Sequence, residues 1–348
     1  MPIPVVQLRE ALTQNLIDVF VEETPKPTFI KSLFKDDLSP TRYVSIEVER
    51  NTEKVAVDVM RGADGNFNAW PKSTQKVYDP PYFKENMFVT EFDLYDQVIG
   101  SGGNNPAMFA RLVNQMASRA NELKAKIDRG YEKMAIAVLE TGIITPKQGE
   151  AINFNRKAGS IVDLGSAGGY WASNNDVFVQ LQAAGDWMRK SAKSSDFIFN
   201  VIMGDQALAD FLNNTKVMAR QNIFHYNPDT IIAPTKENSG AIYHGTVSAN
   251  SYRFQLWSYP QYYDVAGVQT ARLNTKLATV LPVNPRFLMA YAAVPELLSE
   301  NGSVPPPMAY RMERFINNEK KTDKFVIDSA AIPIPVAVDA IYTMKAVA

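Results

Sequence analysis

Few side chains in this sequence could carry out chemistry. Cysteine is absent, and histidine occurs only at His225 and His244. Without cysteine there is no disulfide, thiolate nucleophile, iron–sulfur cluster or cysteine-based zinc site. The two histidines lie among aromatic residues, and neither belongs to a His-Glu-x-x-His pattern. We therefore expect both histidines to be structural or simply exposed, and we expect no bound metal.

Paired carboxylates and glycine-rich loops give equally weak signals. Asp36 and Asp37 lie next to a turn, where solvated charges are the ordinary interpretation, although folding could still bring a catalytic pair together. The segments 100–103 and 165–169 match neither phosphate-binding pattern and are more typical of flexible linkers. The sequence predicts no enzymatic activity, no catalytic residue and no cofactor.

Composition and charge narrow the class of protein. The 348 residues are 46% hydrophobic and 21% charged, which is typical of a globular chain of one to three domains. Lys and Arg number 36 against 37 Asp and Glu, so the net charge of −1 argues against a strongly basic nucleic-acid-binding protein. No secretory signal and no apolar run of about 20 residues is present. We expect a soluble protein made in a cytoplasm, without a membrane segment.

The strongest periodic signal begins at Pro106. From Phe109 to Val138, apolar residues recur every three or four positions, and charges fill the other faces. The pattern predicts a helix over 106–140, a rod of about 50 Å at about 1.5 Å per residue, which Thr141 and Gly142 end. Packing on one sheet and a coiled coil are both open at this point.

Residues 43–95 show a different period. Val44–Val48 and Val55–Val59 alternate apolar and polar side chains, which predicts an antiparallel hairpin across five polar residues. A loop rich in Gly, Asn and Pro follows, and the chain is expected to be extended again over 84–95. Such a stretch has few core positions and cannot easily stabilise itself, so it points to an obligate oligomer.

The rest of the chain alternates between helical and extended patterns. We expect a helix over 6–21, a hairpin within 143–164, and a helix over 175–190 capped by Asn174 or Asn175. A buried strand at 197–203, a helix at 205–213 and several strands within 223–295 follow, with further strands at 324–328 and 334–347. The class is α+β, and the C-terminal strands return to the part that holds the long helix.

The succession of these segments resembles the phage major capsid protein E family, the lambda-type shell proteins with the Hong Kong 97 fold. The resemblance covers about 20–345 and rests on the order of six pieces: TRYVSIEVERNTEKVAVDVMRG, VYDPPYFKENMFVT, YEKMAIAVLETGIIT, INFNRKAGSIVDLG, FIFNVIMGDQALADFL and TKVMARQN. It implies five parts: an N-terminal arm (1–42), an extended loop (43–95), a peripheral domain (96–190) with the spine helix (106–140), an axial domain (191–315), and C-terminal strands (316–348) that return to the peripheral domain.

The resemblance implies the function as well. The chain would be the non-enzymatic major capsid protein of a tailed double-stranded DNA phage or prophage, assembling as hexamers and pentamers into an icosahedral head around the genome. Assembly would take place in the bacterial cytoplasm, and the product would be the virion capsid. The implied partners are further copies of the chain, a separate scaffolding protein, a portal protein, optionally a decoration protein, and packaged DNA by non-specific proximity, with no membrane.

Six residues are predicted to contact neighbouring subunits: Arg61, Phe67, Trp70 and Tyr78 on the extended loop, and Leu123 and Ile127 on the long helix. Two other functions stay open. One is an encapsulin-like non-viral shell, which would enclose a cargo enzyme and no DNA. The other is a monomeric α+β enzyme with a site of scattered carboxylates, which would give no reason for residues 43–95 to be extended.

Overall fold

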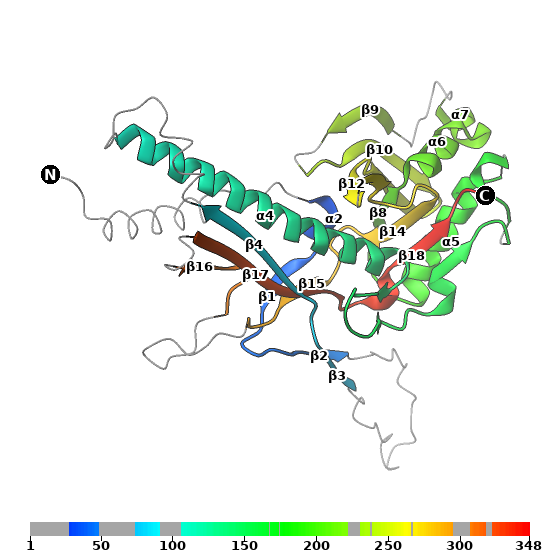
Figure 1. Cartoon of the computed structure of the whole chain (residues 1–348). Coiled ribbons are helices and arrows are strands. Elements are labelled where there is room, and N and C mark those ends of the chain that lie inside the picture. Colours follow the sequence, from blue (N-terminus) through cyan, green and yellow to red (C-terminus); the bar gives the residue numbers. More distant parts are fainter. Residues whose placement is uncertain are drawn as a thin grey trace, which may run out of the picture.

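Helix α4 (Pro106–Glu140) extends along a ribbon of long strands and reaches a second, more compact group of strands and helices (Figure 1). The structure is a computed structural model, and it describes residues 28–48, 74–90, 106–166, 168–173, 175–221, 230–236, 239–265, 267–294, 307–317 and 322–348. The long helix has the predicted bounds, so the prediction for 106–140 is confirmed. The predicted helix over 6–21 lies outside the described residues.

A five-stranded sheet forms the elongated part of the molecule. Its order is β1 (Lys35–Leu38), β15 (Phe287–Tyr291), β17 (Thr322–Pro335) and β16 (Arg311–Asn317), and β4 (Tyr82–Thr90) also pairs with β17. Residues 322–328 of β17 pair antiparallel with β16, residues 322–330 with β4, and residues 331–335 with β15. One long strand near the C-terminus therefore holds together segments from both ends of the chain.

One face of α4 packs on this sheet. Ala120, Ile127, Tyr131 and Ala135 of the helix are almost fully buried, at the spacing of three, four and seven residues that defines a single helical face. The Tyr131 ring lies edge-on to Phe83 of β4, with 5.2 Å between ring centroids. Over residues 117–140 the helix thus covers a sheet of its own chain, which confirms the first of the two predicted packings.

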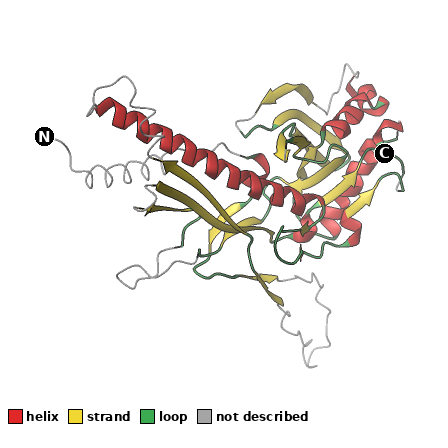
Figure 2. Ribbon diagram, viewed as in Figure 1, coloured by secondary structure: helices red, strands yellow, loops and turns green. Residues whose placement is uncertain are grey.

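A seven-stranded mixed sheet forms the compact part. Its order is β7 (Ile161–Asp163), β18 (Tyr342–Lys345), β14 (Leu277–Pro282), β8 (Ile198–Met203), β11 (Tyr252–Ser258), β10 (Ile242–Ala249) and β9 (Thr230–Lys236). Helices α5 (Val177–Lys190), α6 (Asp205–Asn213) and α7 (Thr215–Gln221) gather at this end of the molecule (Figure 2). Trp171, Phe199, Phe211 and Phe254 are fully buried between helices and sheet.

The remaining described elements are short. They are α2 (Phe29–Ser32), the ribbon β2 (Val44–Val48) with β3 (Thr74–Tyr78), the hairpin β5 (Ile143–Ile144) with β6 (Ile152–Asn153), the hairpin β12 (Tyr262–Val265) with β13 (Val268–Ala271), and the 3-10 turns η1 (Ala158–Ser160), η2 (Trp171–Ser173) and η3 (Val338–Ala340).

Local sequence patterns misplaced some partners. The described partner of β2 is β3, whereas the predicted partner, 55–59, lies outside the described residues. Helix α5 is capped by Asp176, whose carboxylate accepts the Phe178 N–H at 3.0 Å, and not by Asn174 or Asn175. The predicted strand at 160–163 is β7, which pairs parallel with β18 and takes no part in the hairpin of β5 and β6. Each error follows from assuming that the nearest compatible segment is the partner.

Sheet membership also departs from the predicted domain boundaries. Helix α5 falls in the predicted peripheral range 96–190 but packs on the seven-stranded sheet. Strands β15 and β16 fall within the predicted axial range 191–315 yet belong to the five-stranded sheet, and β18 of the range 316–348 joins the seven-stranded sheet. The chain therefore crosses between the two sheets more often than a division into consecutive segments allows.

Candidate functional site

The histidine that the structure describes does not form part of a reactive group. His244 of β10 lies with its Nε2 atom 2.8 Å from the Ser258 hydroxyl of β11, and burial lowers its pKa. His225 lies outside the described residues. In the described part of the chain, no group of three or more His, Asp and Glu side chains could hold a metal ion. Function is therefore to be sought in contacts and mechanical connections.

A polar joint fastens the segment before β1 to the long helix. The Glu132 carboxylate of α4 accepts the N–H groups of Ile30 at 3.1 Å and Lys31 at 2.7 Å, so it supplies acceptors for the start of α2. Burial raises the pKa of Glu132, although these two hydrogen bonds favour its charged form. The Lys31 ammonium donates to the Asp128 carboxylate and, at 2.8 Å, to the Tyr310 hydroxyl. Charges buried in this way are stable only because they are paired.

Apolar contacts strengthen the same joint. Phe29, Ile30 and Phe34 are buried, and the Phe34 ring stacks on Phe287 of β15 with 5.0 Å between centroids. Strand β1 then pairs parallel with β15. Residues 28–38 are consequently an integral part of the elongated half, which gives the segment before them a fixed point of departure.

A second joint connects the C-terminal end of α4 to the compact half. The Arg156 guanidinium donates to the Leu139 carbonyl at 2.7 Å and to the Ile341 carbonyl at 3.0 Å. It thereby satisfies a carbonyl in the last turn of α4 and ties it to the segment that leads into β18. Burial lowers the pKa of Arg156 to about 10. Glu140 accepts the Asn274 N–H at 2.7 Å, so α4 is bound at its end to the loop before β14.

The β2–β3 ribbon stands apart from both sheets. Val44 is buried, and the Tyr78 ring lies 5.6 Å from that of Phe154, so the base of the ribbon rests on its own chain. Tyr43 and Val77 are exposed large apolar side chains at the same base. A two-stranded ribbon is marginally stable by itself in water. Its apolar side chains therefore call for a further surface.

The predicted contact residues separate into three groups. Arg61, Phe67 and Trp70 lie outside the described residues. Tyr78 attaches the ribbon to Phe154. Leu123 is partly buried against the sheet, and Ile127 is only 1% exposed, so in this structure both helix residues pack against their own chain. Among the described residues, Tyr78 is therefore the one nearest to a surface that a neighbour could reach.

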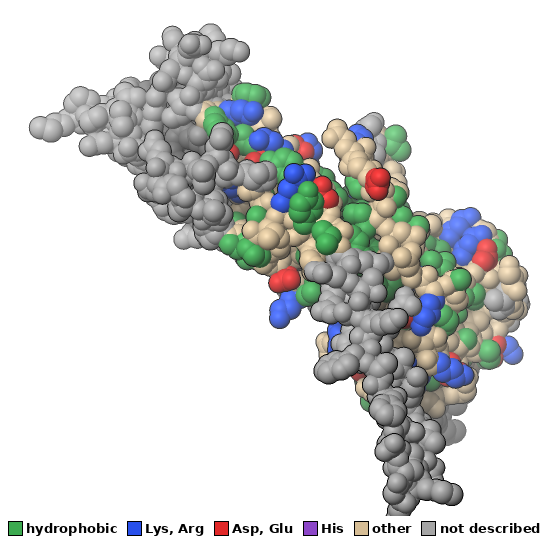
Figure 3. Space-filling model, turned by 90° about the horizontal axis from the view of Figure 1, so that it is seen from below, with side chains coloured by type: hydrophobic (Ala, Val, Ile, Leu, Met, Phe, Trp, Pro, Cys, Tyr) green, Lys and Arg blue, Asp and Glu red, His purple; other side chains and the backbone are tan. Residues whose placement is uncertain are grey.

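Sequence reasoning missed a set of exposed aromatic residues on the elongated sheet. Phe88 of β4 and Phe315 of β16 are 56% and 51% exposed. Their signal was available in the alternation of β4, where Phe83, Glu85 and Met87 face α4 and the intervening residues face outward. Seen from below, apolar side chains are interspersed with charged ones over the described surface (Figure 3).

Comparison with solved structures identifies the fold. A protein assigned as a prophage capsid protein from Escherichia coli CFT073 matches with a TM-score of 0.63 at 14% identity, covering 97% of this chain and 98% of that one. A phage-related protein from Bordetella bronchiseptica RB50 matches with a TM-score of 0.53 at 12% identity, covering 95% and 96%. The capsid of cyanophage P-SCSP1u gives 0.49 at 11% identity, covering 93% and 89%. A search among curated proteins gives no significant match.

A long helix on an elongated sheet, a compact second half and a projecting ribbon are together the architecture of a phage shell subunit with the Hong Kong 97 fold. The family model for phage major capsid protein E matches residues 13–346, which is nearly the whole chain. The chain belongs to that family, and its role is that of a phage or prophage capsid protein. The predicted α+β fold class and the predicted family are both confirmed. None of the described helices is long and apolar enough to cross a membrane.

Proposed function

We propose that this chain forms rings of six and five copies and that these rings close into the icosahedral head of a tailed double-stranded DNA phage or prophage. The role is structural, without catalysis and without a cofactor. Assembly takes place in the bacterial cytoplasm around a separate scaffolding protein, a portal protein occupies one vertex, and a decoration protein is an optional later addition. The packaged DNA meets the inner surface without specific contacts, in keeping with a net charge of −1.

The observation that carries this proposal is the β2–β3 ribbon. Its strands pair only with each other among the described strands, and its base leaves Tyr43 and Val77 exposed. A neighbouring copy that receives the loop 43–95 would bury this surface. Because the donor and the receiver then use different patches, the contact is heterologous, and heterologous contacts close into rings.

Loop replacement tests the proposal. Replacing residues 51–71 by Asn-Gly keeps β2 and β3 and supplies a two-residue hairpin turn. We expect a soluble, folded subunit that forms no closed shells, measured by velocity sedimentation and negative-stain microscopy after co-expression with the neighbouring genes. A matched control replaces Lys147 and Gln148, which are exposed between β5 and β6, by serine and should assemble normally. Normal shells from the loop variant would contradict the assignment of this loop to a contact between subunits.

Two alternatives make different predictions. An encapsulin-like shell would purify with a cargo enzyme and without DNA; the family match to a phage capsid protein favours the phage reading. A monomeric enzyme would run as a compact particle of 38.8 kDa and show turnover. Mass and nucleic-acid content of the purified particle distinguish all three.

A further inference from the structure

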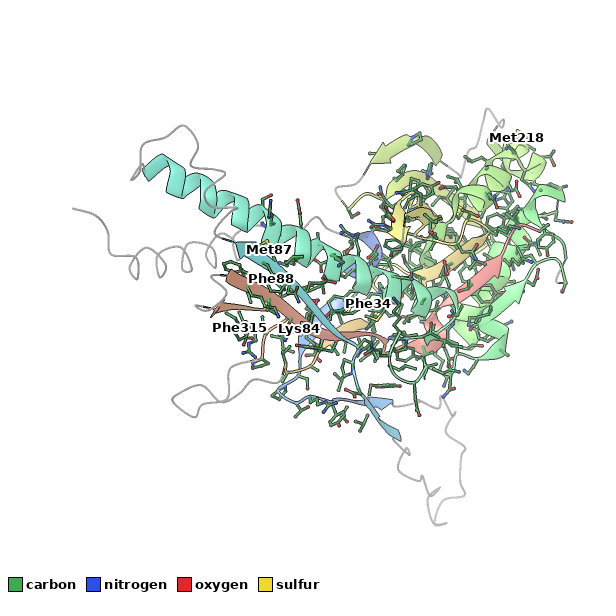
Figure 4. All side chains as sticks on the ribbon, in the orientation of Figure 1. Phe34, Lys84, Met87, Phe88, Met218 and Phe315 are labelled. Atoms are coloured by element: carbon green, nitrogen blue, oxygen red, sulfur yellow. The ribbon has the colours of Figure 1, made fainter. Side chains whose placement is uncertain are left out.

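The outer face of the elongated sheet carries a row of three side chains from three strands. In the strand register, Lys324 of β17 lies opposite Phe88 of β4 on one side and opposite Phe315 of β16 on the other. Residues opposite one another point to the same side of a sheet. Figure 4 places Phe88 and Phe315 on the two outer strands, toward the same end of the ribbon. This aromatic–lysine row faces away from α4, since its neighbours Met87 and Phe325 lie on the helix side.

The row is exposed, and its charge is unmatched. The Lys324 ammonium lies 5.6 Å from the centroid of the Phe88 ring, and within the described part of the chain it has no carboxylate partner. The next charged groups on this face are already paired: Lys84 lies 3.7 Å from Asp328, and Arg311 contacts Glu313. Two half-exposed phenyl rings around a free ammonium suit a partner that offers an apolar side chain next to a carboxylate.

The chain itself has such a surface at the other end of the same sheet. All four side chains of β1 are exposed, and Leu38 is 47% exposed next to Asp37, whose carboxylate has no partner among the described residues. Two other exposed apolar residues have an acidic neighbour, but those carboxylates are engaged. Asp196 near Phe197 accepts the Ser194 hydroxyl, and Asp264 near Tyr262 accepts the Gly267 N–H.

We propose that in the assembled shell the aromatic–lysine row of one copy packs against Asp37 and Leu38 of the next copy. The two surfaces lie on β16 and β1, the two ends of the strand order β1-β15-β17-β16, so the contact joins neighbouring subunits head to tail. The inference rests on the proposed shell function and adds to it a contact independent of the loop 43–95. It assigns the occupant of this face as a second copy of the chain, by charge complementarity.

Charge exchange tests the contact. Lys324→Glu and Asp37→Lys are made singly and together, and Lys147→Glu, on an exposed loop residue, is the matched control. Each single variant should lower the fraction of subunit recovered in particles about fivefold, the equivalent of about 1 kcal/mol per contact. The double variant should recover most of the lost assembly, because the ion pair is restored with its direction reversed. The control should match the unmodified chain.

The outcomes separate the inference from the function on which it rests. The unmodified chain must form rings or shells under the conditions used; if it does not, the proposed function fails, and this contact fails with it. If it does, normal assembly of either single variant would overturn the contact, and so would a double variant as defective as the singles. Thermal unfolding of each unassembled variant, within about 2 °C of the unmodified subunit, shows that the fold is intact.

Discussion

The two sheets differ in how much of their surface the chain itself covers. In the seven-stranded sheet, β8 and β14 are buried along most of their length, with helices and loops over their faces. In the elongated sheet, α4 covers one face, and β4 alternates between half-buried residues toward the helix and exposed residues on the other side. The compact half satisfies its own hydrophobic surface, whereas the elongated half retains a face for other molecules.

Helix α4 makes this difference useful for a shell. It is joined to the start of the described chain through Glu132 and to the compact half through Arg156 and Glu140. Because both joints are polar and buried, they hold the two halves in one relative orientation only while every partner is present. We therefore expect substitutions in the compact half to act on folding, and substitutions on the outer face of the elongated half to act on assembly.

The largest effect is expected in the core of the compact half. Phe199 of β8 is fully buried and lies 5.8 Å, between ring centroids, from Phe254. Phe199→Ala should lower the free energy of unfolding by about 3–5 kcal/mol, because it removes a buried ring and leaves a cavity. Urea unfolding of the unassembled subunit measures this. Val179→Ala, on the exposed face of α5, is the control and should change the free energy by less than about 0.5 kcal/mol.

The joint between helix and compact half should be nearly as sensitive. Arg156→Lys keeps the charge but loses the planar fork, so buried carbonyls of α4 and of residue 341 lose their donor. We expect the free energy of unfolding to fall by about 2–4 kcal/mol. Arg189→Lys at the exposed end of α5 should have little effect. Equal unfolding free energies for the two variants would show that Arg156 does not connect the halves.

The Glu132 joint gives a smaller, pH-dependent effect. Burial raises the pKa of this carboxyl in the folded subunit above the model value of 4.5. Between 4.5 and the raised pKa the folded state binds more protons than the unfolded state, so stability falls as the pH rises through that window. The free energy of unfolding relative to Glu132→Gln should therefore be largest at the acidic end and level off above the raised pKa. A difference that grew with pH would mean that the pKa is lowered instead.

The smallest effect on folding is expected on the outer face. Phe315→Ser should change the free energy of unfolding by less than about 1 kcal/mol, because half of the ring is already exposed, yet it should reduce assembly. Phe325→Ser is its counterpart on the helix side of β17, where the ring is 1% exposed, and it should destabilise the subunit severely. If both variants unfolded alike, the outer face would be part of the core and the contrast between the sheets would fail.

Sequence patterns predicted the elements whose signal is local. Helix α4 and helix α6 begin and end at the predicted residues, because Pro106 starts one and uninterrupted periodicity defines both. The partner of β2 was missed because β3 follows after 25 further residues, and alternation reports a strand without reporting its partner. The exposed Phe88 and Phe315 were missed for a related reason. Which face of a strand meets the helix is decided by the whole sheet.

Particle size tests the central claim most directly, namely that this chain builds a shell from many copies. The purified protein, alone and co-expressed with neighbouring genes, is examined by size-exclusion chromatography with light scattering and by negative-stain microscopy. The account predicts rings of five or six subunits, or closed shells, of a 38.8 kDa chain. A stable monomer of that mass under every condition, co-expression included, would contradict it.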